Sequence, residues 1–274
     1  MSNIKIEVSG LDKEVGIKEY LLSLGYSITF IKKVKYGGIL LGSSPVTVRA
    51  TVKNGDVIEL VPPVLKSENI PPIDIPIRVI FEDDDLVVFD KPSNMPTHPS
   101  RGNSLPTLAN AAVAKYGENF VFRAVTRLDR DTSGIVLVAK NQVSAHRLSS
   151  DMKLGRFEKK YRCTVCGTPT PEHALIDAPI QREYEGSIKR IVAEGGKRAL
   201  TEYNVISSNG DSSECEIILH TGRTHQIRVH MSHIGHPLVG DFLYGTANDD
   251  GYKLRCVELS FPHPTTRETI TVKA

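Results

Sequence analysis

The stretch AVTRLDRDTSGIVLVAKN, residues 124–141, places four charges in five residues, 127–131, directly before an apolar run. The run 135–139 is rich in β-branched residues and is typical of a buried strand. The turn residues at 132–134 lead into that strand, so the charged residues are held at a rigid edge of a sheet, where functional sites are often built. Two interpretations stay open at this point. Either the aspartates bond turn amides in a polar loop, or arginines keep one carboxylate ionised in a cleft.

Short strands surround this stretch from residue 77 onward. Runs of β-branched residues between turn signals occur in RVIFEDDDLVVFDKP, KKYRCTVCG, ALTEYNVISS, SECEIILHTG and TITVKA. The spacing of apolar residues predicts helices over 105–117 and 142–155, and a third near 224–235. Because the strands do not alternate regularly with helices, a doubly wound parallel sheet is disfavoured. The sequence therefore predicts an α+β fold in which a mixed sheet carries a few helices.

A proline-rich stretch divides the chain. Five prolines occur in the sixteen residues VPPVLKSENIPPIDIP, and they remove backbone donors and exclude a regular helix or a central strand. We therefore predict a small N-terminal module over 1–61, a linker over 62–76 and a larger domain over 77–274. Within the module, IKEYLLSLGYS has helical spacing. The segment VTVRATVKNGDVIELVP predicts two strands joined into a hairpin by Asn54 and Gly55.

Basic residues gather in two places although the net charge is only +2. In the module, Lys32, Lys33 and Lys35 belong to the segment FIKKVKYGGILLG. These lysines either follow a phosphate backbone or form a solvated face, and the sequence favours neither reading. The stretch 147–162 carries six lysines and arginines against two acidic residues. Local fields of this kind matter more for binding than the total charge.

The composition is that of a soluble globular protein. A chain of 274 residues with 40% apolar content can bury a sizeable core. Four cysteines are too few for a disulfide scaffold, and Cys163 and Cys166 fall on opposite faces of a predicted strand, so we expect reduced thiols that pack in the fold. The sequence has no apolar run long enough for a membrane span and no signal region in MSNIKIEVSG. We expect a cytoplasmic protein.

The second candidate stretch, LHTGRTHQIRVHMSHIGHPLVGDFLYG, covers residues 219–245 and holds Arg223, Arg228 and five histidines. A metal site is disfavoured, because the stretch has no His-Glu-x-x-His pattern, no Cys/His pairing and no carboxylate before Asp241. Arginines that bind a carboxylate or phosphates fit the pattern better. We therefore expect no metal.

Three segments in this order, RLDRDTSG, KKY and LHTGRTHQIRVHMSHIGHPLVGDFLYG, resemble the three sequence signatures of the RluA family of pseudouridine synthases. The flanking segments DDDLVVFDKPSNMPTHPS, ALIDAPIQR, GGKRALTEY and FPHP are also similar to the family, from about residue 78 to the C-terminus. The resemblance implies a catalytic domain with a mixed, mainly antiparallel central sheet flanked by helices. The N-terminal α/β module resembles, more weakly, the small RNA-binding domain that many relatives carry.

The resemblance implies that uridine within an RNA chain is isomerised to pseudouridine without a cofactor. Asp129 is then the essential catalytic residue, as a nucleophile or as a base toward the ribose, and both roles need a carboxylate that is ionised at neutral pH. The resemblance also implies a catalytic arginine, and Arg228 is the preferred ion-pair partner of that carboxylate, with Arg223 as the second choice. Tyr161 would stack on the uracil, and its hydroxyl would help remove the proton on carbon 5.

The family chemistry also requires the target base to leave the RNA stack, which costs a few kcal/mol. Arg127 is the expected wedge, because a planar guanidinium can stack where the base was. With it, the substrate-binding residues implied by the resemblance are Leu128, Arg223, His225 and Gln226.

Two residues depart from the family pattern. Thr126 stands where many relatives have His before RLD, and Arg198 stands where proline or a small residue is commoner. We do not expect Thr126 to abolish activity, because no step above needs an imidazole there.

Other function classes fit less well. A glycoside hydrolase needs two carboxylates facing each other across a sugar, about 5 Å or more apart, and the neighbouring turn residues Asp129 and Asp131 suit that poorly. An RNA-binding protein without catalysis stays the alternative class. We expect RNA as the partner, most of all 23S-type ribosomal RNA of the large subunit with transfer RNA as the alternative, no membrane, and a monomer.

Overall fold

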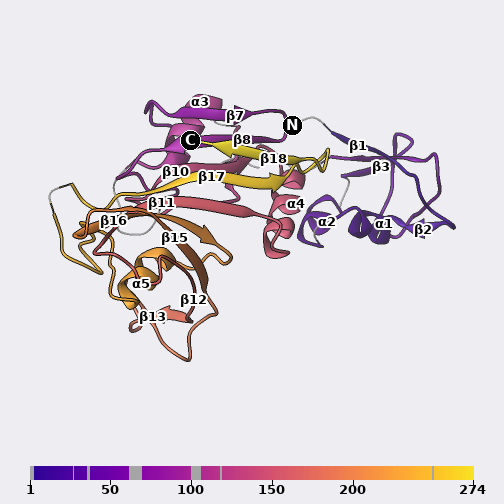
Figure 1. Cartoon of the computed structure of the whole chain (residues 1–274). Helices are drawn as coiled ribbons and strands as arrows, with labels where there is room; N and C mark the ends of the chain where they lie inside the picture. Colours follow the sequence, from indigo (N-terminus) through magenta and orange to yellow (C-terminus); the bar gives the residue numbers. More distant parts are fainter. Residues whose placement is uncertain are drawn as a thin grey trace.

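The computed structural model describes residues 3–26, 28–35, 38–61, 70–99, 106–117, 119–248 and 250–274. A large sheet forms the centre of the molecule, and a smaller module of N-terminal residues lies at one end of it (Figure 1). The strands of the large sheet are β7 (Arg78–Glu82), β8 (Leu86–Lys91), β9 (Arg123–Ala124), β10 (Ser133–Ala139), β11 (Glu158–Cys166), β12 (His173–Asp177), β15 (Leu200–Ser208), β16 (Ser212–Leu219), β17 (Leu254–Pro262) and β18 (Thr269–Lys273). Their spatial order is β12-β15-β16-β11-β17-β10-β8-β7, with β18 paired to β17 and β9 paired to β10.

One pair of strands in the large sheet is parallel. β10 and β17 meet through Ser133 opposite Arg255 and Gly134 opposite Cys256, whereas the other pairings of the described strands are antiparallel. Gly134 has φ +106°, and a Cβ at this position would collide with the backbone of Cys256. Glycine therefore allows the two strands to approach. The predicted mixed, mainly antiparallel sheet is confirmed.

Three helices pack against the large sheet. They are α3 (Leu108–Tyr116), α4 (Gln142–Lys153) and α5 (Gln226–His233), so all three predicted helices form. Thr107 begins α3 with a capping box, in which its hydroxyl accepts a hydrogen bond from the backbone N–H of Asn110. Leu148 of α4 and Met231 of α5 are fully buried in the core between helices and sheet. The β-branched residues of α5 do not prevent the helix, because that buried face stabilises it.

The N-terminal module has its own hydrophobic core. Its elements are β1 (Ile4–Glu7), β2 (Val15–Gly16), α1 (Ile17–Ser23), α2 (Ile28–Val34), β3 (Ile39–Leu41), β4 (Ser44–Pro45), β5 (Thr51–Val52) and β6 (Val57–Leu60). Leu21 of α1, Phe30 of α2 and Ile58 of β6 are buried together in a cluster separate from the core of the large sheet. Val143 of α4 packs against this cluster, so the module contacts α4, as Figure 1 also shows.

The predicted hairpin around Asn54 and Gly55 is wrong. β6 pairs with β1 and β3, and β5 pairs with β2, so the two predicted strands belong to different sheets. A two-residue type I′ hairpin turn needs positive φ at both central residues, and in this turn only Gly55 has it. The Asn54 side chain instead bonds both backbone groups of Leu11. The hairpin of the module is β3–β4, where Gly42 and Ser43 both have positive φ.

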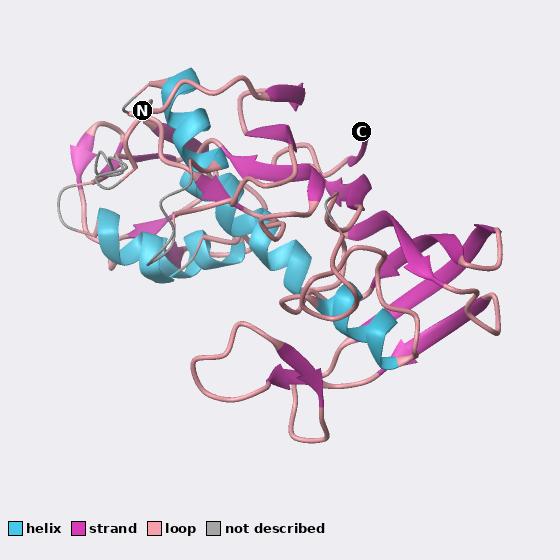
Figure 2. Ribbon diagram, turned by 90° about the vertical axis from the view of Figure 1, so that its left-hand side faces the viewer, coloured by secondary structure: helices cyan, strands magenta, loops and turns pink. Residues whose placement is uncertain are grey.

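A short hairpin projects from the large sheet. β13 (Ile180–Arg182) and β14 (Arg190–Val192) pair antiparallel and form the lowest part of the molecule in Figures 1 and 2. Ile180 forms a small apolar cluster with Ala199 and Val229 of α5. The base of this hairpin is therefore held against α5.

The proline-rich stretch is irregular where the structure describes it. Residues 70–77 adopt neither helix nor strand, as the prolines predict, and residues 62–69 lie outside the described ranges. The division into 1–61, 62–76 and 77–274 stays a prediction. Within the described ranges, no helix combines the length and the apolar character needed to cross a bilayer.

Candidate active site

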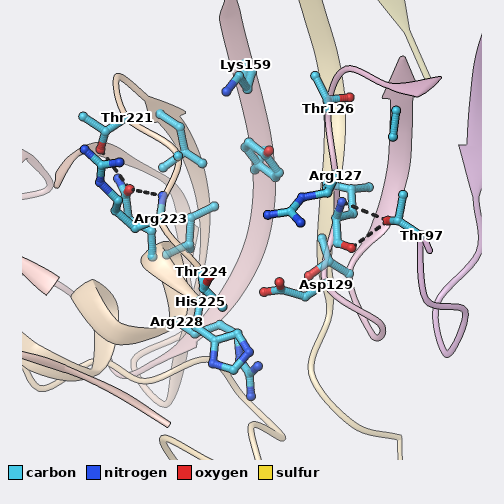
Figure 3. A pocket seen from close by; sticks show the side chains of 18 of the residues that line it. Thr97, Thr126, Arg127, Asp129, Lys159, Thr221, Arg223, Thr224, His225 and Arg228 are labelled. Carbon is cyan, nitrogen blue, oxygen red and sulfur yellow. Dashed lines mark hydrogen bonds between the residues drawn. The ribbon is translucent and has the colours of Figure 1, made fainter. Parts of the chain in front are cut away.

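A cavity of about 1010 Å³ opens between the turn before β10, strand β11 and the start of α5 (Figure 3). The residues predicted from sequence to form the site all line it: Arg127, Leu128, Asp129, Tyr161, Arg223, His225, Gln226 and Arg228. These residues are up to 101 positions apart, since the first is 127 and the last is 228. The fold thus brings the three sequence signatures to one place, whereas the roles assigned to their residues stay predictions.

The turn that carries Asp129 is clamped by a preceding loop. The Thr97 hydroxyl donates to the carbonyl of Leu128 at 2.8 Å and accepts from the backbone N–H of Leu128 at 3.2 Å. Ser93 donates to the carbonyl of Asp131 at 2.8 Å. The backbone on both sides of Asp129 is therefore fixed by hydrogen bonds, which limits the freedom of the carboxylate.

Lys91, the last residue of β8, also fixes this turn. This lysine is fully buried, and its ammonium donates three hydrogen bonds, to the carbonyls of Pro92, Met95 and Arg130. Three donors thus meet three acceptors, which is the full capacity of the group. Burial lowers the pKa of Lys91 to about 8, and the negative charges of Asp131 and Asp129 act in the opposite direction.

The Asp129 carboxylate points into the cavity from this turn, as Figure 3 shows. It makes no hydrogen bond or ion pair with any other described residue. Asp131, by contrast, is paired with Arg130 at 2.8 Å. A partly buried carboxylate that keeps its lone pairs available is suited to act on a substrate as a nucleophile or a base.

Strand β11 contributes two neighbouring side chains to the cavity. Lys159 and Tyr161 are two positions apart, so they lie on the same face of the strand. Burial raises the pKa of Tyr161 well above its usual value, and Asp129 acts in the same direction. The phenol is therefore neutral at pH 7. Burial lowers the pKa of Lys159.

The expected ion pair between Arg228 and Asp129 is wrong. Arg228 Nε and Nη2 both donate to the Asp241 carboxylate, each at 2.7 Å. Arg223, the second choice, donates from Nε to the carbonyl of Arg198. The physical reason is that Asp241 is fully buried and needs a bidentate partner, which the guanidinium supplies.

Aromatic rings complete the surroundings of Arg228. Its guanidinium lies 4.4 Å from the ring centre of Tyr252, 4.9 Å from that of Tyr244 and 5.6 Å from that of Phe242. These contacts are cation–π interactions that add to the ion pair. Burial acts to lower the pKa of Arg228, but the hydrogen bonds to Asp241, together with smaller contributions from the charges of Tyr252, Asp241 and Asp129, outweigh it, so the pKa is raised. Arg228 is thus a fixed positive charge whose field reaches the Asp129 carboxylate, although the two groups are not bonded.

Gln226 shapes the loop that begins α5. Its amide oxygen accepts from the hydroxyl of Thr221 and the backbone N–H of Arg223, and its amide nitrogen donates to Leu200 and Thr201. All of these partners belong to the protein. Although Gln226 was predicted as a substrate-binding residue and lines the cavity, its hydrogen bonds fix the loop.

The histidines of the 219–245 stretch have separate partners. His220 contacts Glu202, His230 contacts Thr201 and Ala178, and His236 contacts the carbonyl of Cys166. No group of three or more histidine, cysteine or acidic side chains placed to hold a metal ion occurs in the described ranges. The expectation of no metal, which was argued from the motif spacing, stays a prediction.

The cavity wall is strongly basic. Among its described lining residues Asp129 is the one carboxylate. The basic residues that line it are Arg127, Arg130, Lys153, Lys159, Arg182, Arg190, Arg223 and Arg228. Because positive side chains of this density attract and hold polyanions, the site suits a substrate within a phosphodiester chain.

Comparison with known proteins agrees with this geometry. Residues 85–233 match the family model described as RNA pseudouridylate synthase. The chain belongs to this family. It is 38% identical over 266 residues to the uncharacterized RNA pseudouridine synthase YjbO of Bacillus subtilis (strain 168), and the match covers 94% of each chain.

Two further relatives extend the comparison. Ribosomal large subunit pseudouridine synthase D of Pasteurella multocida (strain Pm70) is 36% identical over 200 residues, which cover 72% of this chain and 61% of that protein. The solved structure of human RNA Pseudouridylate Synthase Domain Containing 1 superimposes with a TM-score of 0.62 at 26% identity, over 73% of this chain and 83% of that one. The pseudouridylate synthase fold is thus shown, and the chain is an RNA pseudouridine synthase by family.

Three residues of the site were missed from sequence. Lys91 had a visible signal, since it is a lysine at the end of an apolar strand, LVVFDK, directly before a proline. Asp241 is visible in the sequence as the one carboxylate near the end of the 219–245 stretch, but the sequence does not indicate its partner. Tyr244 gave no signal, because its contacts with His225 and Arg190 depend on the tertiary fold.

The departure at Thr126 has a structural explanation. Its hydroxyl accepts a hydrogen bond from the backbone N–H of Leu137 at 2.9 Å, and the residue is 8% exposed. Thr126 therefore joins the site turn to β10. Arg198, the second departure, is exposed and lies 3.5 Å from Asp177.

Proposed function

We propose that this pseudouridylate synthase isomerises specific uridines of large-subunit ribosomal RNA, with Asp129 as the catalytic residue. The observation that carries the proposal is a single clamped carboxylate that faces Tyr161 in an otherwise basic cavity. Because Asp129 makes no ion pair with another described residue, it is available to the ribose of the substrate, as a nucleophile or as a base.

The surrounding side chains support the flipping of the target base. Arg127 is exposed and extends into the cavity beside Asp129 (Figure 3), so its guanidinium can fill the space that the base leaves in the RNA. The neutral phenol of Tyr161 is buried in the cavity wall and presents an aromatic ring to the flipped uracil. Leu128 lines the cavity and belongs to the hydrophobic core, with 8% of its surface exposed.

The choice of ribosomal RNA rests on the relative from Pasteurella multocida, which is named a ribosomal large subunit pseudouridine synthase. Transfer RNA is the alternative substrate. We further propose that the enzyme works in the cytoplasm as a monomer and without a cofactor, since the site needs no group beyond its own side chains for this chemistry.

The test is to map pseudouridine in total cellular RNA from cells that lack the gene. Complementation uses the wild type or Asp129→Asn, which keeps the size of the side chain and removes its charge. We expect one or more modified positions in large-subunit RNA to disappear on deletion and to return only with the wild type. If no position changes while the purified protein binds RNA, the protein is an RNA binder and the catalytic proposal fails.

A further inference from the structure

The Tyr244 hydroxyl connects the projecting hairpin to the cavity. It lies 2.8 Å from the backbone nitrogen of Arg190, the first residue of β14, and 2.8 Å from His225 Nδ1. His225 in turn lines the cavity. One hydroxyl therefore joins a residue of the hairpin to a residue of the candidate active site.

The direction of these two hydrogen bonds follows from the donors present. A backbone N–H can only donate, so the Tyr244 oxygen accepts from Arg190. The hydroxyl has one proton of its own, and His225 Nδ1 is its one acceptor among the described residues. Donation of this proton to Nδ1 satisfies both groups, and we assign the bond in that direction. A neutral imidazole whose Nδ1 accepts must carry its own proton on Nε2.

The backbone of His225 is also fixed in an unusual conformation. Its φ is +58° and its ψ is 18°, in the left-handed region that residues other than glycine rarely adopt. It precedes α5 without a side-chain hydrogen bond to the helix. Its ring packs edge-on against the ring of Tyr244, with centroids 5.7 Å apart and an interplanar angle of 80°. Strained residues held by their surroundings in this way cluster at functional sites.

Burial keeps His225 neutral. Desolvation lowers its pKa; the charges that face it are Asp129 and Asp241, which act against this shift, and Arg228 and Arg190, which act with it. Burial raises the pKa of Tyr244 to about 12, so its hydroxyl keeps the proton that it donates. The pair is thus one neutral donor chain at physiological pH.

We propose that Tyr244 is a positioning residue that fixes His225 as a neutral imidazole, whose Nε2–H donates a hydrogen bond to a carbonyl oxygen of the flipped uracil. This inference rests on the proposed function. It assigns a defined protonation state to His225 and names Nε2 as the atom that meets the substrate.

The chemistry of the reaction gives this donor a purpose. When the bond between the ribose and uracil nitrogen 1 breaks, both electrons stay on the uracil, and its negative charge spreads onto the two carbonyl oxygens. A hydrogen bond from Nε2 stabilises that charge without proton transfer, so the histidine is unchanged when carbon 5 forms the new bond and loses its proton. A preorganised donor of this kind acts most strongly where charge develops.

The first experiment measures the protonation state directly. Long-range ¹H–¹⁵N correlation spectra of histidine side chains in the full-length protein distinguish the two neutral forms, with the His225 signals assigned by their loss in His225→Asn. We expect the Nε2–H form alone in the wild type and a mixture of both forms in Tyr244→Phe. A wild-type spectrum with the proton on Nδ1 would overturn the proposal.

The second experiment measures activity as tritium release from [5-³H]uridine-labelled ribosomal RNA isolated from cells that lack the gene. We expect Tyr244→Phe to lower kcat by about 10-fold to 100-fold and to change KM less than twofold. The matched control is Tyr203→Phe, which removes the hydroxyl of another tyrosine, bonded to the carbonyl of Pro171, and leaves kcat unchanged. An unchanged kcat in Tyr244→Phe would contradict the role of the tyrosine.

A third comparison tests the position of the donor and does not depend on Tyr244. The amide nitrogen of His225→Gln reaches the place of Nε2, whereas that of His225→Asn reaches only the place of Nδ1. Asn tolerates the left-handed backbone better. We nevertheless expect Gln to keep at least 10-fold more activity than Asn, and the reverse order would reject the inference. Wild-type protein that releases no tritium would instead defeat the proposed function itself, while the spectra still report on the histidine.

Discussion

At the scale of single residues, Arg228 and Asp241 form the most deeply buried ion pair among the described residues. Their side chains are 3% and 0% exposed, and both carboxylate oxygens accept from the guanidinium at 2.7 Å. Burial of a charge is costly unless a partner with good geometry compensates it. Removing one member therefore costs more than the intact pair contributes.

We predict that Asp241→Asn lowers the free energy of unfolding by about 3–5 kcal/mol, because it leaves the Arg228 charge buried without its counter-ion. Urea unfolding followed by circular dichroism measures this change. The matched control is Asp177→Asn, since Asp177 pairs with Arg198 where both side chains are more than half exposed, and we expect it to cost less than about 1 kcal/mol. Equal effects of the two variants would show that Asp241 is not needed for Arg228.

The sequence predicted which residues line the cavity, but it did not predict the ion pairs and hydrogen bonds that these residues form. All eight predicted residues line the cavity, because all of them belong to the three sequence signatures that the fold brings together there. The partner of Arg228 was not predictable from sequence. Both Asp129 and Asp241 lie in segments that resemble the family signatures, and only the fold shows that Asp241 is the carboxylate buried against the guanidinium. The contacts of Lys91 and Tyr244 join distant segments, so no spacing rule reveals their partners, although the place of Lys91 at the end of an apolar strand is a visible signal.

At the scale of secondary structure, α4 is tied to the far end of the sheet through one carboxylate. Asp151 is buried in the last turn of α4 and accepts two hydrogen bonds from Arg267, in the turn between β17 and β18, and one from Arg156. The hydrogen bonds from Arg267 are the main cause that lowers the pKa of Asp151. Burial opposes this shift, and the hydrogen bond from Arg156 and the charges of both arginines add to it.

We predict that this contact makes stability depend on pH in the acid range. Because the folded pKa of Asp151 is lowered, its contribution is fully present above the ordinary aspartate pKa of about 3.9 and is lost as the pH falls through the lower folded value. Urea unfolding between pH 3 and pH 6 should therefore show a shallower decline for Asp151→Asn than for the wild type. Asp12→Asn, which removes an exposed carboxylate, is the control, and parallel curves for wild type and Asp151→Asn would reject the prediction.

Elements with strong periodicity were predictable, and short ones were not. The helices α3, α4 and α5 were placed correctly because their apolar faces are read directly from the sequence. The two-residue strand β5 pairs with β2 instead of β6, and the Asn54 side chain, which follows β5, bonds the backbone of Leu11. Pairing of such short strands is decided by tertiary contacts that a local pattern does not contain.

At the scale of the whole molecule, basic side chains gather in two parts of the chain. Eight line the cavity, and Lys32 and Lys33 are exposed on α2 of the N-terminal module. The module contacts α4 through Val143, and the C-terminal end of α4 reaches the cavity wall at Lys153. An RNA chain bound in the cavity has a route along α4 toward the module.

We predict that Lys32 and Lys33 contact RNA phosphates. The slope of log K against log salt concentration should then fall by about 0.7 to 0.9 for each lost contact in the double variant Lys32→Gln with Lys33→Gln. Filter binding of ribosomal RNA between 50 and 300 mM KCl, chosen as a range of roughly sixfold around physiological salt, measures the slope. Lys5→Gln with Lys53→Gln removes the same charge from other exposed positions of the module. If both double variants keep the wild-type slope, the lysines of α2 are only a solvated face.

The position of β17 in the large sheet has a consequence for how the enzyme is made. This strand, Leu254–Pro262, lies between β10, which follows the Asp129 turn, and β11, which carries Tyr161. It is translated after every other strand of the large sheet except β18. On the ribosome, a nascent chain that already contains Asp129 and Tyr161 therefore still lacks β17, the strand that joins β10 to β11. Because the sheet is incomplete until this strand is made, we expect the candidate active site to assemble only late in synthesis, which delays the onset of activity.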